Sequence, residues 1–228
     1  MLILAIESSA KPASAAVCLN EKILGQYYQN NGLTHSRTLL AMVESLLANL
    51  DIKISDIELL AVSRGPGSFT GVRIGVSAAK GIAWGSDKPI CGVSTLEAMA
   101  YQALQPGAIL CPVMDARRDQ VYNALFECSG GTLVRLCGDR AISLNDLASS
   151  LCDFEKPCLL IGDGAQMSHD FLLKAGVDCH LPPPMLRYQT AYGVALAAMH
   201  AEPTSAVSLE PSYLRPSQAE RMRSGAES

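Results

Sequence analysis

Residues 57–84 read IELLAVSRGPGSFTGVRIGVSAAKGIAW. The apolar run Ile57–Val62 predicts a buried strand, and the glycines on either side of Pro66 end it. A helical pattern then runs from Phe69 to Trp84. A strand, a tight turn and a helix in immediate succession form the repeating unit of α/β proteins, so we expect this fold class.

The same order of elements occurs twice along the chain. The first half predicts three antiparallel strands, a helix, the strand above and its helix, and residues 109–175 repeat this order. Such a duplication predicts two similar subdomains with mixed β-sheets covered by helices. We place the first subdomain at residues 1–104, a smaller second one at 105–188, and a C-terminal helix and tail at 189–228.

The turn between Arg64 and Gly71 has two interpretations. The amides that begin the following helix suit an anion above the strand end, whereas the glycines alone suit a purely structural turn. Its spacing matches neither GxxxxGK[ST] nor GxGxxG, and the turns after Glu7 and at Asp115–Asp119 lack glycine, which argues against a complete ATP clamp. The candidate residues near a nucleotide are Ser8, Ser9, Gly65, Gly67, Ser68 and Arg117.

Two helices carry features of a partner interface. In the helix from Phe69 to Trp84, small residues recur every three or four positions, and this shallow stripe would let another helix approach closely. The helix from His35 to Leu50 has a wide apolar face, which can serve the subdomain core or a partner. Burial within the chain itself is the alternative. The predicted interface residues are His35, Leu39, Met42, Val43, Leu46, Gly71, Gly75, Ala78, Ala79 and Ile82.

Composition excludes several classes of function. The chain has 228 residues, 49% hydrophobic and 5% aromatic, so its cores must consist mainly of Ala, Val, Ile and Leu. A formal net charge of −4 argues against strong nucleic-acid binding by this chain alone. The eight cysteines form no CxxC pair, and the sequence pattern predicts neither a signal peptide nor a membrane span. We expect a reduced, soluble, cytoplasmic protein.

The residues also predict no catalytic group and no metal ligand. None of the four histidines has a second ligand at metal-binding spacing within its own element. The nucleophile motif Gly-x-Ser-x-Gly is absent as well.

Several stretches together resemble the family built around TsaD, the tRNA threonylcarbamoyladenosine transferase subunit. They occur in family order, and the block from Gly65 to Gly75 is highly specific. Where TsaD has two metal-binding histidines, this chain has Thr95 and Met99, which cannot replace imidazole. The resemblance thus implies a non-catalytic relative. The matching stretches are Leu4–Ser9, Leu33–Ser36, Gly65–Gly75, Ala79–Ala83, Gly92–Ala98, Asp115–Arg118, Val121–Tyr122 and Pro211–Arg215.

The resemblance implies an actin-like ATPase (ASKHA) fold and a role in modifying the adenosine beside the anticodon of tRNAs that read codons starting with A. It implies a heterodimer with TsaD through the two helices, with the ATPase TsaE docking on the pair and tRNA bound only through the complex. No intrinsic cofactor is implied, but ATP or ADP fits at the interface with TsaD, and a homodimer fits the chain alone. An independent ATPase or kinase and a glycoprotease are the alternatives, because fold alone does not give function.

Overall fold

The first lobe is built on a five-stranded mixed sheet. In this computed structural model, which describes residues 1–117 and 119–215, the strand order is β3-β2-β1-β4-β5. The first three strands pair antiparallel, and β4 and β5 continue parallel to β1. The elements are β1 (Leu2–Glu7), β2 (Ala13–Leu19), β3 (Lys22–Gln29), α1 (His35–Asn49), the 3-10 helix Ile54–Asp56, β4 (Leu59–Ser63), α2 (Phe69–Ser86), β5 (Ile90–Val93) and α3 (Thr95–Gln102).

The second lobe repeats this arrangement, with the order β10-β7-β6-β11-β12 and a hairpin, β8–β9, added on β6. Here β6 corresponds to β1, and β11 pairs parallel to it as β4 does in the first lobe. The predicted duplication and the α/β class are therefore confirmed. The elements are β6 (Ile109–Asp115), β7 (Gln120–Asn123), β8 (Phe126–Ser129), β9 (Thr132–Arg135), β10 (Arg140–Ser143), α4 (Leu144–Leu151), β11 (Cys158–Ile161), α5 (Ala165–Lys174) and β12 (Cys179–His180).

Residues 121–127 form a β-type pattern that predicts a single strand, but the structure divides them between β7 and β8. β7 pairs with Val113–Asp115 and β8 with Ile109–Leu110, so the division falls opposite Pro112. Proline has no N–H to donate to a neighbouring strand, which explains the interruption. At this interruption the buried side chain of Asn123 bonds to the neighbouring backbone, where its Nδ2 donates to Pro112 O at 3.0 Å. β10 pairs antiparallel with β7, as β3 does with β2 in the first lobe. It is therefore the third strand of the repeat, and sequence analysis missed it.

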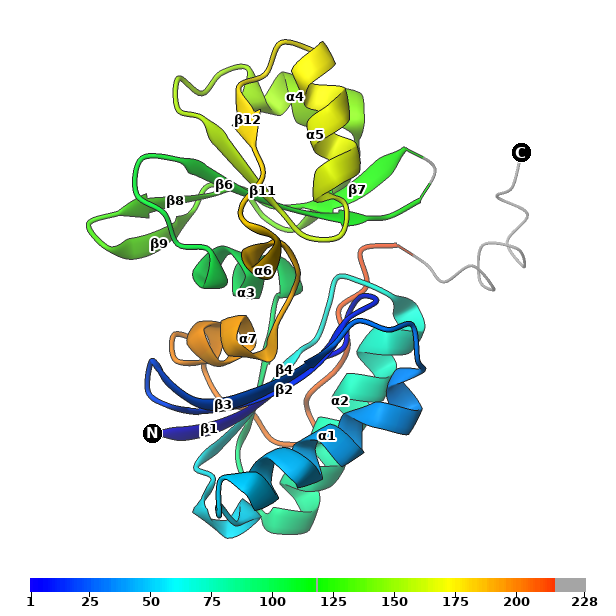
Figure 1. Ribbon diagram of the computed structural model, residues 1–228, viewed down its shortest axis with the longest axis vertical. Helices are drawn as coiled ribbons and strands as arrows, with labels where there is room; N and C mark the ends of the chain where they lie inside the picture. Colours follow the sequence, from blue (N-terminus) through cyan, green and yellow to red (C-terminus); the bar gives the residue numbers. More distant parts are fainter. Residues whose placement is uncertain (118, 216–228) are drawn as a thin grey trace.

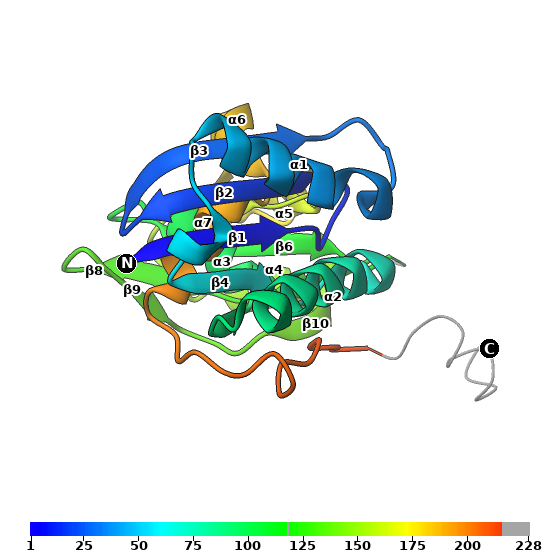
Figure 2. The same ribbon diagram turned by 90° about the horizontal axis from the view of Figure 1, so that it is seen from below.

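The two lobes stack with helices between them. Figure 1 shows, from bottom to top, α1 and α2, the first sheet, a middle layer of helices, the second sheet, and α4 and α5. The middle layer consists of α3, α6 (Pro184–Arg187) and α7 (Ala191–Ala198). Seen from below, α1 and α2 cover the outer face of the first sheet (Figure 2). The segment after residue 189 thus returns to the first lobe, with α7 packed on β1 and β2.

Cores and caps follow the expected chemistry. The buried clusters consist largely of Ala, Val, Ile and Leu, with Phe126 the largest fully buried side chain. Ser94 caps α3, since its Oγ accepts a hydrogen bond from Glu97 N at 3.3 Å. All eight cysteines are free thiols. Within residues 1–117 and 119–215, no helix has the length and apolar character needed to cross a bilayer.

Candidate functional site

The first candidate site is the corner where the loop after β1 meets the start of α2. Ser8 and Ser9 are fully buried there. Ser8 Oγ donates to Gly71 O at 2.9 Å, and Ser68 N donates to Ser9 O at 2.6 Å. The loop therefore lies directly on the first turns of the helix.

The small residues of α2 make this contact with the loop. A Cβ atom at Gly71 would come closer than 3.0 Å to Ser8 O, and one at Gly75 equally close to Ser8 Oγ. Real Cβ atoms do not show such separations, so these two positions need glycine. This corrects the interpretation of the stripe as a track for a partner helix, because its glycines receive a loop of the same chain.

The structure brings together five of the six residues predicted to lie near a nucleotide. Ser8, Ser9, Gly65, Gly67 and Ser68 meet in the corner, whereas Arg117 is exposed in the turn between β6 and β7 of the second lobe. Two amides that an anion would need are already bonded. Ser68 N donates to Ser9 O, and Gly71 N donates to Ser68 Oγ at 3.3 Å. Gly65 has a left-handed φ of +116°, and Ser212 O packs against it.

Sequence analysis missed two carboxyl groups: Glu7, which is fully buried, and Asp163, which is partly exposed. Glu7 is 0% exposed at the end of β1, and its Oε1 accepts from Ser9 N at 2.5 Å. Its Oε2 has no hydrogen-bond partner within residues 1–117 and 119–215. Asp163 follows β11 in the second lobe. Burial raises the pKa of both carboxyls, and the charge of Asp163 raises that of Glu7 further.

The surroundings of Glu7 and of Asp163 favour the protonated form of each carboxyl group. Withdrawal from water and a nearby negative charge both favour the neutral form of a carboxyl group; the charge is that of Asp163 for Glu7 and that of Asp115 for Asp163. Among the residues that the structure describes, no group of three or more His, Cys, Asp and Glu side chains is placed to hold a metal ion. The sequence does hold a sign of these two groups, because each acid comes at or just after the end of an apolar strand. Glu7 ends β1, and Asp163 follows β11 between Gly162 and Gly164.

The second candidate site is the outer side of α1 and α2, and most of the predicted interface residues do not lie on it. His35, Ala78 and Ile82 are partly exposed, and His35 Nε2 lies 2.7 Å from Ala10 O. The others belong to the interior of the first lobe, because the wide apolar face of α1 points at the sheet. These buried residues are Leu39, Met42, Val43, Leu46, Gly71, Gly75 and Ala79.

The outward side chains of the two helices form what we call the helix-pair surface. Two large apolar side chains stand on it, Leu40 at 54% and Trp84 at 83% exposure. The others are small or partly buried, and the charged residues of the same face are Arg37, Glu44 and Arg73. Its uncharged members are Leu40, Ala41, Ser45, Ala48, Ile74, Ser77, Ala78, Gly81 and Trp84.

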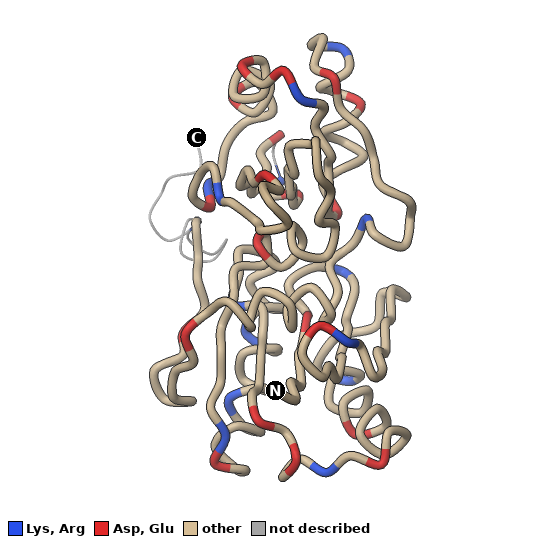
Figure 3. The backbone as a smooth tube through the Cα atoms, turned by 90° about the vertical axis from the view of Figure 1, so that its left-hand side faces the viewer, with Lys and Arg blue, Asp and Glu red and all other residues tan. Residues whose placement is uncertain are grey.

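A groove between α3 and the loop after β9 holds paired charges. Arg135 lies 2.8 Å from Glu97 and 2.6 Å from Asp139, and Ser94 Oγ donates to Asp139 at 2.6 Å. These bonds pair the charges of Arg135, Glu97 and Asp139 with one another and tie the second lobe to α3. On the side of the molecule seen in Figure 3, basic and acidic residues are interspersed over both lobes. On the helix-pair surface, uncharged residues outnumber charged ones, which makes it the candidate place for a partner.

The duplicated lobes place the protein in the class of actin-like ATPase folds. A ROK family protein from Streptococcus pneumoniae is similar in structure, with a TM-score of 0.52 and 12% identity over 88% of this chain and 98% of that one, which shows the fold alone. The family model of TsaD, tRNA N6-adenosine threonylcarbamoyltransferase, matches residues 28–219.

Relatives define the family more closely. The chain is 33% identical to the tRNA threonylcarbamoyladenosine biosynthesis protein TsaB of Bacillus subtilis, over 96% of both chains. Its structure is similar to YeaZ from Pseudomonas aeruginosa, with a TM-score of 0.79 and 25% identity over 93% of this chain and 99% of that one. The chain belongs to the TsaB (YeaZ) family within the wider TsaD family, which confirms the resemblance found in the sequence.

Proposed function

We propose that this chain is an accessory subunit in tRNA threonylcarbamoyladenosine biosynthesis, which docks on a TsaD-type catalytic subunit and keeps it active. The helix-pair surface is the observation that carries the proposal. Leu40 and Trp84 are exposed on it among small uncharged side chains. Covering them with a partner would release about 25 cal/mol for each Å² of apolar area removed from water.

The geometry of the two helices suits a partner of the same fold. Small outward residues allow helices to approach to about 8–10 Å between their axes. A TsaD-type subunit, as a member of the same wider family, would present equivalent helices, so that four helices pack together. TsaE would dock on the pair and tRNA would bind through the complex. ATP or ADP would bind at the contact between subunits, because the amides of Ser68 and Gly71 in the corner are already bonded within the chain.

The residues at the family's metal positions support an accessory role. Thr95 and Met99 stand where TsaD has histidines, and they are 0% and 1% exposed. Met99 packs in the cluster between the lobes, where its side chain fills space. This chain would then contribute a surface to the acyl transfer, and the reacting groups would belong to the partner.

Trp84 is the single tryptophan of the chain and provides a direct test of docking. Adding a TsaD-type subunit should shift its emission to shorter wavelength and reduce its quenching by iodide. Leu40→Lys should weaken binding by about tenfold or more, since it buries a charge. Leu173→Lys is the matched control, because Leu173 is 52% exposed on α5 of the second lobe.

Reconstitution tests the accessory role itself. We expect tRNA modification from a TsaD-type subunit, TsaE, threonylcarbamoyl-adenylate and this chain together, and its loss when this chain is omitted. Modification of tRNA by the chain alone, or at full rate without it, would contradict the proposal. Turnover of ATP with a small-molecule acceptor by the chain alone would favour the kinase alternative.

A further inference from the structure

The segment Thr204–Arg215, which we call the strap, is bound firmly to the first lobe. Thr204 pairs with Ile90 at the edge of the first sheet. Leu209 is 3% exposed and belongs to the core under α2. Ser212 N donates to Arg64 O at 2.6 Å, so the strap is held close to the start of α2.

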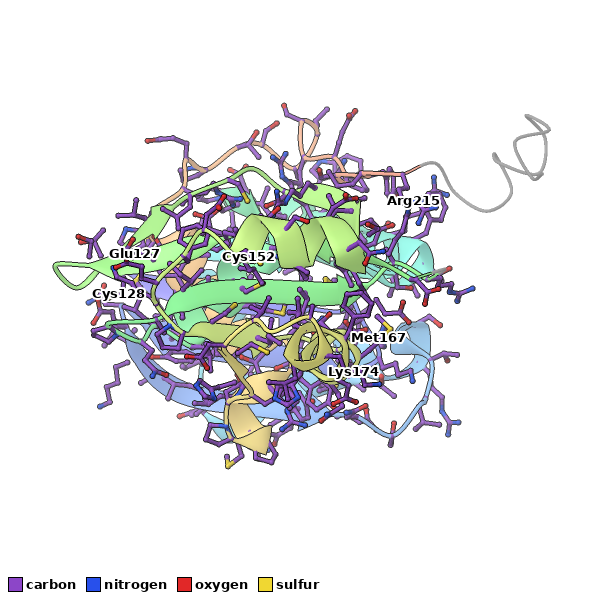
Figure 4. The ribbon with its side chains drawn as sticks, turned by 90° about the horizontal axis from the view of Figure 1, so that it is seen from above. Glu127, Cys128, Cys152, Met167, Lys174 and Arg215 are labelled. Carbon is purple, nitrogen blue, oxygen red and sulfur yellow. The ribbon has the colours of Figure 1, made fainter. Side chains whose placement is uncertain are left out.

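Near its end the strap holds the side chain of Arg73. The ring of Tyr213 lies 4.7 Å from that of Phe69, and the guanidinium carbon of Arg73 lies 3.9 Å from the centre of the Phe69 ring. Arg73 Nε donates to the Tyr213 hydroxyl at 2.9 Å. Farther along, Arg215 Nη1 donates to Ala116 O at 3.0 Å, where Figure 4 shows it at the edge of the molecule. The guanidinium of Arg73 is thus fixed by an aromatic face and a hydroxyl.

Among the residues that the structure describes, Arg73 uses only part of its donor capacity. An arginine has five N–H donors in a rigid fork, and only Nε of Arg73 bonds to another described residue. Within residues 1–117 and 119–215, no carboxylate lies within 4.0 Å of it, whereas Arg135 has two such partners. A long side chain that is already ordered loses little further entropy on binding, so this fork is preorganised for an anion.

The position of Arg73 on α2 identifies the source of that anion. It lies one turn from Ser77 and beside Ile74, at the margin of the helix-pair surface. A protein that covers the uncharged residues of this surface would bring its own side chains to the fork. Water would be displaced at the same time, which strengthens the attraction between opposite charges.

We infer that Arg73 binds a carboxylate of the docking subunit, and that Phe69 and Tyr213 are positioning residues that hold it for this contact. The inference rests on the proposed function. A guanidinium and a carboxylate form two parallel hydrogen bonds, which fix orientation as well as adding affinity. The strap would then determine how the partner sits on α1 and α2.

Binding of a TsaD-type subunit at low and high salt, about 0.05 M and about 0.5 M, tests the inference. Arg73→Gln should weaken binding about tenfold at low salt and flatten its salt dependence. Arg73→Lys should recover only part of the loss, because an ammonium cannot form the paired bonds. Tyr213→Phe should weaken binding a few-fold while keeping the salt dependence, since the charge remains.

Lys174→Gln on α5 of the second lobe is the control for net charge (Figure 4). It should change neither the affinity for the subunit nor its salt dependence. If the wild-type chain does not bind the subunit, the proposed function fails. If it binds and Arg73→Gln leaves affinity and salt dependence unchanged, even with a lowered Tm, this inference alone fails. If sedimentation shows that Arg73→Gln separates a homodimer while leaving the affinity for the subunit unchanged, the carboxylate belongs to a second copy and the assignment is wrong.

Discussion

Replacing Gly75 with alanine tests whether the glycines of α2 make room for the loop at Ser8. Alanine gains about 1 kcal/mol of helix stability over glycine at an interior position. At Gly81, in the same helix, nothing lies within 4 Å of an added Cβ, so Gly81→Ala should raise the free energy of unfolding by up to about 1 kcal/mol. At Gly75 the added methyl group would overlap Ser8 Oγ.

The overlap determines the sign of the effect at Gly75. Overpacking costs about 1–3 kcal/mol, and displacing Ser8 Oγ from Gly71 O costs about 1 kcal/mol more. After the gain in helix propensity, Gly75→Ala should lower the free energy of unfolding by about 1–3 kcal/mol. Ser8→Ala should relieve the overlap, because Ser8 Cβ would lie 3.5 Å from the new methyl group, an ordinary contact.

Urea unfolding followed by circular dichroism, with Tm from calorimetry, measures these differences. The double variant with Ser8→Ala and Gly75→Ala should be at least as stable as Ser8→Ala alone. If Gly75→Ala is as stable as Gly81→Ala, or if the two losses simply add in the double variant, the loop does not explain the glycine at position 75.

Three further predictions concern protonation, thiols and the strap. Because the folded-state pKa of Glu7 is raised above its ordinary 4.5, the native chain holds a proton that the unfolded chain releases, and stability falls as pH rises from 4.5 through the raised pKa. Glu7→Gln should make the fall in Tm with rising pH shallower, and a Tm–pH profile parallel to that of the wild type would contradict this prediction. In the native state, Cys152 should react fastest with a disulfide reagent near pH 8, since it is exposed, while burial raises the pKa of Cys18 and Cys91 to about 11; equally fast labelling of Cys18 on mass spectrometry would refute this. Leu209→Ala should lower the free energy of unfolding by about 2–5 kcal/mol and speed amide exchange at Tyr213, and unchanged exchange would show that Leu209 does not anchor the strap.

Local patterns in the sequence were sufficient for most of the elements and for their duplication, although they missed β10. Ser94 with Glu97 three residues later predicts a capped helix, and the structure has that cap. The divided strand opposite Pro112 could not be foreseen in the same way, because the loss of a donor matters only once the neighbouring strand is known.

The candidate site depended on contacts that are distant in sequence. Gly71 and Ser8 are 63 residues apart, and Arg73 and Tyr213 are 140 apart, so no local pattern reveals either contact. Helical periodicity correctly found the apolar face of α1 but could not say whether the sheet or a partner covers it. The sheet covers Leu39 and Leu46, which leaves Leu40 and Trp84 outside.

The return of α7 to the first lobe has a consequence for how the chain is made. The second lobe occupies an uninterrupted stretch from β6 to β12, so it can close as soon as that stretch leaves the ribosome. The first lobe begins the chain but still lacks α7 and Leu209 at that moment. Its apolar interior therefore stays partly uncovered until residues 191–209 have been made, so the first lobe is completed after the second although its strands precede it in the chain.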